Sequence, residues 1–107
     1  MNIIKCNTCF LLVMVTILAM THFLSGCSMI YDGKKLFFEE GCSQCHTFKG
    51  KGGRMGPDLS AVTNTRSDGW IESYIHDPKK ENPQARMPSF NKLSSSKRKA
   101  IIAFLKN

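Results

Sequence analysis

The chain has 107 residues, a length that allows one domain at most. Fifteen Lys and Arg residues against eight Asp and Glu residues give a formal net charge of +7, so the surface is basic. A basic surface suits nucleic acid, anionic lipid or an acidic protein, or serves solubility alone. Aromatic residues do not interleave with the basic ones as they do in nucleic-acid binders, so we expect no nucleic-acid partner.

The first segment, residues 1–26, is predicted to be a signal peptide. Residues 10–24 form an apolar run that is short for a membrane-spanning helix but typical of a signal peptide. The run ends in Leu24-Ser25-Gly26-Cys27, which resembles a bacterial lipobox, and this resemblance implies that Cys27 is lipidated and begins the mature protein. An uncleaved N-terminal anchor is the alternative. Both interpretations tether the domain to a membrane outside the cytoplasm, with residues 27–30 as the lipidated terminus and a short spacer.

A first helix is expected directly after this spacer. Asp32 can cap its N-terminus, the helix runs to about Glu40, and Gly41 is placed to end it.

The next stretch, Cys42-Ser43-Gln44-Cys45-His46, has the Cys-x-x-Cys-His pattern of covalent haem c attachment. Two thiols three positions apart can each add to one vinyl group of a single haem, and the histidine that follows can ligate the iron. A thioredoxin-like redox pair would need a βαβ pattern around it, and a zinc site would need a second Cys/His cluster; the mature sequence has neither. Because Cys6 and Cys9 lie in the signal segment, no disulfide is expected.

Further elements follow this motif in a recognisable order. Gly56-Pro57-Asp58-Leu59 comes first, then a Met87-Pro88 step, then a closing amphipathic helix. With these residues the chain resembles the class I c-type cytochromes over residues 31–106, and most of all the free-standing relatives of the cytochrome domain fused to some terminal oxidases. The resemblance implies an all-α fold, a small class I cytochrome c domain over residues 31–107. Three to four helices would pack around one covalently attached haem.

The resemblance also implies roles for single residues near the haem. Cys42 and Cys45 hold the haem, and His46 is the proximal iron ligand. The carbonyl of Pro57 accepts a hydrogen bond from the other ring nitrogen of this histidine, which raises its basicity. Leu59 packs on the haem edge.

Other implied roles concern the helices. Gly33 and Phe37 would let the first helix cross the last one closely. Trp70 and Tyr74 share one face of a second helix, which Ser67 can cap and which runs to about His76. In the family such aromatics lie over the haem, whereas plain core packing is at least as good an interpretation for Tyr74.

Two stretches are expected to lack regular structure. Residues 47–54 are rich in Lys and Gly and are predicted to form a solvated loop. Residues 78–83 are predicted to form a charged loop. No run of alternating apolar and polar residues is long enough to build a sheet.

Met87 is the expected second iron ligand, because the family carries a methionine followed by proline at this place. A thioether is a soft ligand that favours ferrous iron and raises the reduction potential. Met55 lies only nine residues after His46, in the loop that must supply Pro57. Met55, His76 and an open sixth position are the alternatives.

Ser94 or Ser95 can cap the last helix, which runs to about Lys106 and carries apolar residues at helical spacing. The first turn of this helix is basic, which opposes the helix dipole and suggests a docking face for an acidic redox partner. The candidate docking residues are Lys79, Lys80, Lys97, Arg98 and Lys99.

We therefore predict a monomeric, membrane-anchored lipoprotein on the periplasmic side or the outer face of the plasma membrane. It would carry single electrons between respiratory-chain donors and acceptors through one haem c ligated by His46 and Met87, without substrate turnover of its own. One alternative is a haem protein with an open sixth site that binds ligands or acts on peroxide. Another is a dedicated electron-transfer subunit of a dehydrogenase or terminal oxidase.

Overall fold

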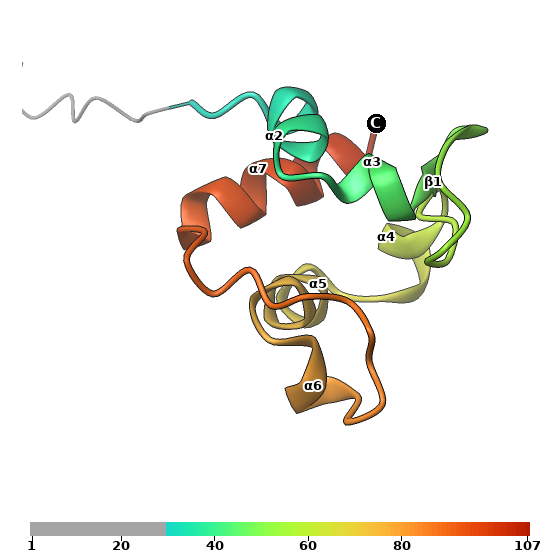
Figure 1. The fold of residues 1–107 in the computed structure, drawn as a ribbon. Coiled ribbons are helices and arrows are strands. Elements are labelled where there is room, and N and C mark those ends of the chain that lie inside the picture. The colour runs from blue at the N-terminus through green and yellow to red at the C-terminus, as the bar shows by residue number, and fades with distance from the viewer. Residues whose placement is uncertain (1–29) are drawn as a thin grey trace, which may run out of the picture.

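The computed structural model describes residues 30–107, so the predicted signal peptide and the lipidation site at Cys27 lie outside the described residues. The described part is mostly helical with little strand, which confirms the predicted fold class (Figure 1). Its elements in chain order are α2 (Gly33–Glu39), α3 (Cys42–Cys45), β1 (Thr47–Phe48), β2 (Lys51–Gly52), α4 (Val62–Thr65), α5 (Asp68–His76), α6 (Pro78–Glu81) and α7 (Ser95–Leu105).

Side-chain caps begin the three longest of these helices at the residues expected from the sequence. Asp32 caps α2, where its carboxylate accepts a hydrogen bond from the Lys35 amide at 3.0 Å. Ser67 and Ser94 cap α5 and α7 in the same way, each through its hydroxyl oxygen and the amide three residues later. Each cap satisfies an amide that the helix itself leaves unpaired and stabilises its helix by about 1 kcal/mol.

The helices α2 and α7 cross closely at Gly33. A Cβ on residue 33 would overlap the backbone oxygen of Ala100 and lie 3.0 Å from the Cβ of Phe104. One turn further along α2, Phe37 is buried, and its ring centroid lies 5.5 Å from that of Phe104. The crossing implied by the family resemblance is thus present, and residue 33 must be glycine for the helices to approach this closely.

Apolar side chains from α2, α5 and α7 form one buried cluster. Phe48 of β1 joins the cluster through Phe104, with the two ring centroids 4.9 Å apart. Each fully buried side chain of this size contributes roughly 1.5–3 kcal/mol. Within residues 30–107 the buried apolar residues are Leu36, Phe37, Phe48, Ile71, Ile75, Leu93, Ile101, Ile102 and Leu105.

No helix in the described part of the chain has the length and hydropathy to cross a membrane.

The prediction of a plain loop over residues 47–54 was wrong, because β1 and β2 form a short antiparallel hairpin there, with Phe48 opposite Lys51. The turn residues Lys49 and Gly50 have φ of 49° and 77°. Positive φ at both turn residues is typical of the type I′ turn, which matches the twist of a hairpin. Each strand has only two residues, too few for an alternating pattern to be visible in the sequence.

Single helical turns form at three places where the sequence indicated none: α3, α4 and α6. The turn α6 replaces the charged loop predicted over residues 78–83. Pro78 occupies its first position, where a missing N–H costs no hydrogen bond, and the Pro78 side chain is buried. Glu81 ends the turn and accepts a hydrogen bond from the Ser73 hydroxyl at 2.8 Å, which ties α6 to α5.

An ion pair ties α5 to α7. The Arg98 guanidinium lies 3.4 Å from a Glu72 carboxylate oxygen, and the Arg98 side chain is only 11% exposed. The Ser95 hydroxyl donates to the same oxygen at 2.6 Å. This hydrogen bond, followed by the charges of Lys99 and Arg98, lowers the pKa of Glu72 although partial burial opposes the shift. Arg98 also donates to the Leu93 carbonyl, so it serves the packing of the helices.

Replacing Gly33 by alanine should lower the free energy of unfolding by roughly 1–3 kcal/mol, because the added methyl group must push α2 away from α7. Gly69→Ala is the matched control, since a Cβ on residue 69 in α5 would meet no atom within 4 Å. The control should be unchanged or stabilised by up to about 1 kcal/mol. Denaturant unfolding followed by circular dichroism measures both, and equal stability of the two variants would contradict the close crossing.

Candidate functional site

Cys42 and Cys45 lie on the single turn α3, three positions apart, which places them on the same side of the turn. Gly41, with φ of 77°, joins α2 directly to this turn. His46 follows with an extended backbone, and its amide donates to the Cys42 carbonyl at 3.0 Å. The three residues of the sequence motif therefore come from one short segment that is held between α2 and β1.

The His46 ring is oriented by a main-chain carbonyl. His46 is 9% exposed, and its Nδ1 lies 2.8 Å from the Pro57 carbonyl oxygen. A carbonyl only accepts hydrogen bonds, so Nδ1 carries the proton and donates it. The Nε2 lone pair is then free, which is the form in which an imidazole ligates a metal. This hydrogen bond is the contact that the family resemblance assigned to Pro57.

Gly56 allows the His46 ring to lie directly against the chain. A Cβ on residue 56 would lie 2.5 Å from Cε1 of the ring, so any side chain there would displace it. The Gly56 amide donates to the Cys45 carbonyl at 2.7 Å, and the Leu59 amide donates to the Thr47 carbonyl at 2.8 Å. The segment after the hairpin thus folds back on α3. The family resemblance implied the role of Pro57, whereas this requirement for Gly56 was missed.

The Cys42 and Cys45 thiols are free and half-buried. Burial raises the pKa of the Cys42 thiol to about 11, which disfavours the thiolate that nucleophilic or redox chemistry would need. A thioether carries no charge and loses no proton, so it suits this environment. These donors therefore fit a haem attached through two thioethers and ligated by a neutral imidazole. Within residues 30–107 no group of three or more His, Cys, Asp and Glu side chains is arranged to hold a metal ion.

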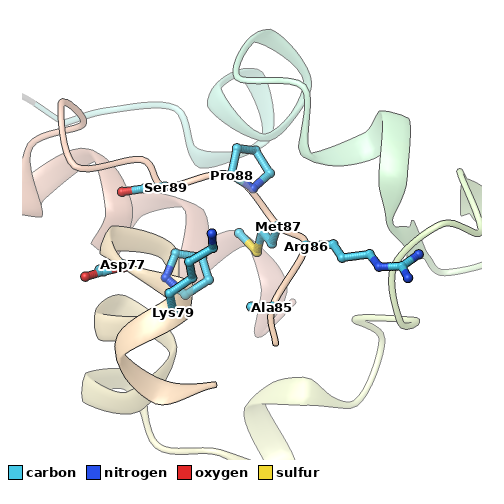
Figure 2. A pocket seen from close by; sticks show the side chains of 8 residues that line it. Asp77, Lys79, Ala85, Arg86, Met87, Pro88 and Ser89 are labelled. Atoms are coloured by element: carbon cyan, nitrogen blue, oxygen red, sulfur yellow. The ribbon is translucent and has the colours of Figure 1, made fainter. Parts of the chain in front are cut away.

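Met87 lies in a different part of the fold. It is half-buried, packs against the core cluster, and lines a cavity of about 580 Å³ between the start of α6 and residues 85–89. Figure 2 shows the Met87 side chain turned toward Lys79, whereas Arg86 points in the other direction. The Cys-x-x-Cys-His residues do not line this cavity. The structure brings this motif together with Pro57 through the His46 ring.

The two alternative ligand residues, Met55 and His76, are both exposed. The Met55 sulfur lies 3.9 Å from the Cys45 sulfur, and Met55 is 86% exposed. Met55 therefore lies beside the attachment motif at an exposed position. His76 is exposed at the C-terminal end of α5.

The aromatic pair on α5 forms a stacked unit. The rings of Trp70 and Tyr74 lie 4.9 Å apart between centroids, with an interplanar angle of 27°. The Arg66 guanidinium lies 4.5 Å from the centroid of the Trp70 ring, within the range of a cation–π contact. Both Trp70 and Leu59 are half-buried and pack against the core cluster, so each has a structural role as well as its predicted role beside the haem.

The candidate docking residues differ in their surroundings. Lys79, Lys80 and Lys99 are exposed. The Lys97 ammonium lies 5.7 Å from the centroid of the Tyr31 ring, and Lys97 is half-buried. Arg98 is engaged in the ion pair between α5 and α7, so its guanidinium is not available to a partner.

Two hydrogen bonds near Met87 were missed by sequence reasoning. The Ser89 hydroxyl donates to the His76 carbonyl at 2.6 Å, and the Phe90 amide donates to the Ile75 carbonyl at 3.1 Å. No pattern in the sequence indicates them, because both acceptors are backbone oxygens and any serine can donate.

Comparison with known protein families matches residues 30–107 to the family described as cytochrome c. The match covers the whole described part of the chain.

Proposed function

The chain belongs to the cytochrome c family, and we propose that it is a membrane-tethered, monomeric carrier of single electrons between respiratory-chain donors and acceptors. Membership of this family implies covalently bound haem c and haem-based electron transfer, and its members are typically electron carriers. The observation that carries the proposal is the His46 ring, which directly follows the two cysteines, is oriented by the Pro57 carbonyl and keeps Nε2 free.

Each residue of the motif has a defined part in holding the haem. Cys42 and Cys45 would hold it through thioether bonds, and His46 would ligate the iron through Nε2. When bound, the haem supplies an iron that alternates between ferric and ferrous states. The Pro57 carbonyl raises the basicity of His46 and fixes the plane of its ring, while Gly56 leaves room for that ring.

We assign Met87 as the second ligand. Its half-burial, the cavity beside it and the rigid proline that follows support this assignment. Met55 is exposed beside Cys45, and His76 is exposed at a helix end, so both fit less well. Leu59 and Trp70 would contribute apolar surface next to the haem.

The exposed basic residues support docking to a redox partner with an acidic surface. Lys79 lines the cavity beside Met87, and Lys80 follows it on α6. The half-buried Lys97 and the exposed Lys99, both on α7, complete the proposed set. Complementary charge of this kind mainly raises the rate of encounter between partners.

The family also suggests a location outside the cytoplasm, and we propose a lipid anchor at Cys27. Support comes from the apolar run at residues 10–24 and the small residues before Cys27, all of which lie outside the described residues. A tether would keep the carrier at high effective concentration near membrane-bound partners.

Optical spectra of the oxidised, reduced and carbon monoxide-treated protein test the ligand assignment. Intact protein should not respond to carbon monoxide, because both axial positions are filled. Met87→Ala should bind carbon monoxide promptly and lower the reduction potential by on the order of 100 mV or more. Met55→Ala removes the same side chain elsewhere and should change neither. A prompt response of the intact protein would instead favour ligand binding or peroxide chemistry.

The rate of electron transfer from the reduced protein to the anion ferricyanide should fall as salt rises, because salt screens the basic surface. The Lys79→Gln/Lys80→Gln double variant should be slower at low salt and less sensitive to salt. Lys34→Gln removes a charge from α2, at the other end of the molecule from α6, and serves as the control (Figure 1). A rate that does not depend on salt would remove the docking role from these lysines.

Intact mass of the protein extracted from membranes tests the anchor. A chain that begins at Cys27 and carries acyl groups is expected. An unmodified Cys27 in a membrane-bound chain would indicate an uncleaved anchor.

A further inference from the structure

The segment that carries Met87 is hydrogen-bonded to the rest of the protein near its two ends, while the Met87 side chain packs against the core cluster. Within the described part of the chain, no backbone group of residues 86–88 makes a hydrogen bond to protein. On the N-terminal side the Ala85 amide donates to the Asn82 carbonyl at 2.9 Å. The cavity of about 580 Å³ lies alongside this segment.

On the C-terminal side the segment is tied to the end of α5. A helix leaves its last carbonyls without partners inside the helix. The Ile75 carbonyl accepts the Phe90 amide at 3.1 Å, and the His76 carbonyl accepts the Ser89 hydroxyl at 2.6 Å. Two consecutive residues after Pro88 thus fill two consecutive acceptors of α5.

Pro88 connects this attachment rigidly to Met87. Its ring fixes its own φ, and it also restricts the backbone of the residue before it to extended conformations. A hydrogen bond at Ser89 therefore limits where the backbone of Met87 can lie. The Phe90 hydrogen bond is made by its backbone amide and survives a substitution. The Ser89 hydrogen bond is made by its side chain, so a substitution can remove it.

We propose that Ser89 is a positioning residue whose hydroxyl bond to the His76 carbonyl holds Met87 against the iron. The inference rests on the proposed role of Met87 as the second ligand. One neutral hydrogen bond at an exposed residue is a small part of the global free energy of unfolding, so the variant should remain folded. The same loss should be measurable in the local opening of residues 86–88, because local segments open with free energies far below that of global unfolding.

The test uses the full-length, haem-loaded ferric protein and cyanide as the probe, which binds only after Met87 leaves the iron. In Ser89→Ala the rate of cyanide binding should rise roughly three- to tenfold, as expected for the loss of one neutral hydrogen bond. The sulfur-to-iron charge-transfer band should weaken in the same variant. Ser89→Thr keeps the hydroxyl and should restore both readouts toward those of the intact protein.

Ser95→Ala is the matched control, because the Ser95 hydroxyl also donates a bond of 2.6 Å but does so to Glu72. It should leave the cyanide rate and the charge-transfer band unchanged, whatever its effect on unfolding by denaturant. Equal cyanide rates for Ser89→Ala and the intact protein would overturn the role of Ser89 and leave the Met87 ligand in place. The Met87→Ala variant tests the ligand assignment separately from the role of Ser89, because loss of the charge-transfer band in this variant would show that the band arises from Met87. If that band is absent from the intact protein as well, the ligand assignment fails and the role of Ser89 fails with it.

Discussion

The close crossing of α2 and α7 at Gly33 is the constraint on which the rest of the structure depends. The helix α2 runs through Gly41 straight into α3, so holding α2 on α7 also holds the cysteine-bearing turn on the core. The helix α7 is in turn joined to α5 by the half-buried ion pair of Arg98 and Glu72. The backbone of Gly33 thus packs directly on the backbone of Ala100, and this contact joins helices from the two ends of the described chain.

Main-chain oxygens accept hydrogen bonds at or next to both of the proposed iron ligands. The Pro57 carbonyl orients the His46 ring, and the carbonyls at the end of α5 retain the segment that follows Met87. Fixing a ligand in this way requires no buried charge beside the iron, and burying an unpaired charge would cost several kcal/mol. It also means that the positions of the ligands follow from the path of the backbone, which the helices and the hairpin determine.

Much of the fold could be predicted from the sequence because its signals are local. Asp32, Ser67 and Ser94 cap the three longest described helices, and a capping residue acts on an amide only three positions away. The Cys-x-x-Cys-His motif is also local, whereas the role of Pro57 came only from the family resemblance. The hairpin was missed because Phe48 is held by a core residue far along the chain, Phe104, and not by its neighbours. Arg98 was likewise predicted as a docking residue because its ion-pair partner, Glu72, lies on another helix, and no sequence pattern indicates that contact.

The tip of the hairpin between β1 and β2 has a practical consequence. One side of the hairpin is held by the buried Phe48 and by the amide of the turn residue Lys49, which donates to the Ser60 hydroxyl at 2.8 Å. At the tip, a Cβ on Gly50 would meet no atom within 4 Å. Extra residues inserted there would extend into solvent, and closing a longer loop costs only about 0.6 kcal/mol for each doubling of its length. An affinity peptide, a fluorescent reporter or a linker to an electrode could therefore be grafted at this tip.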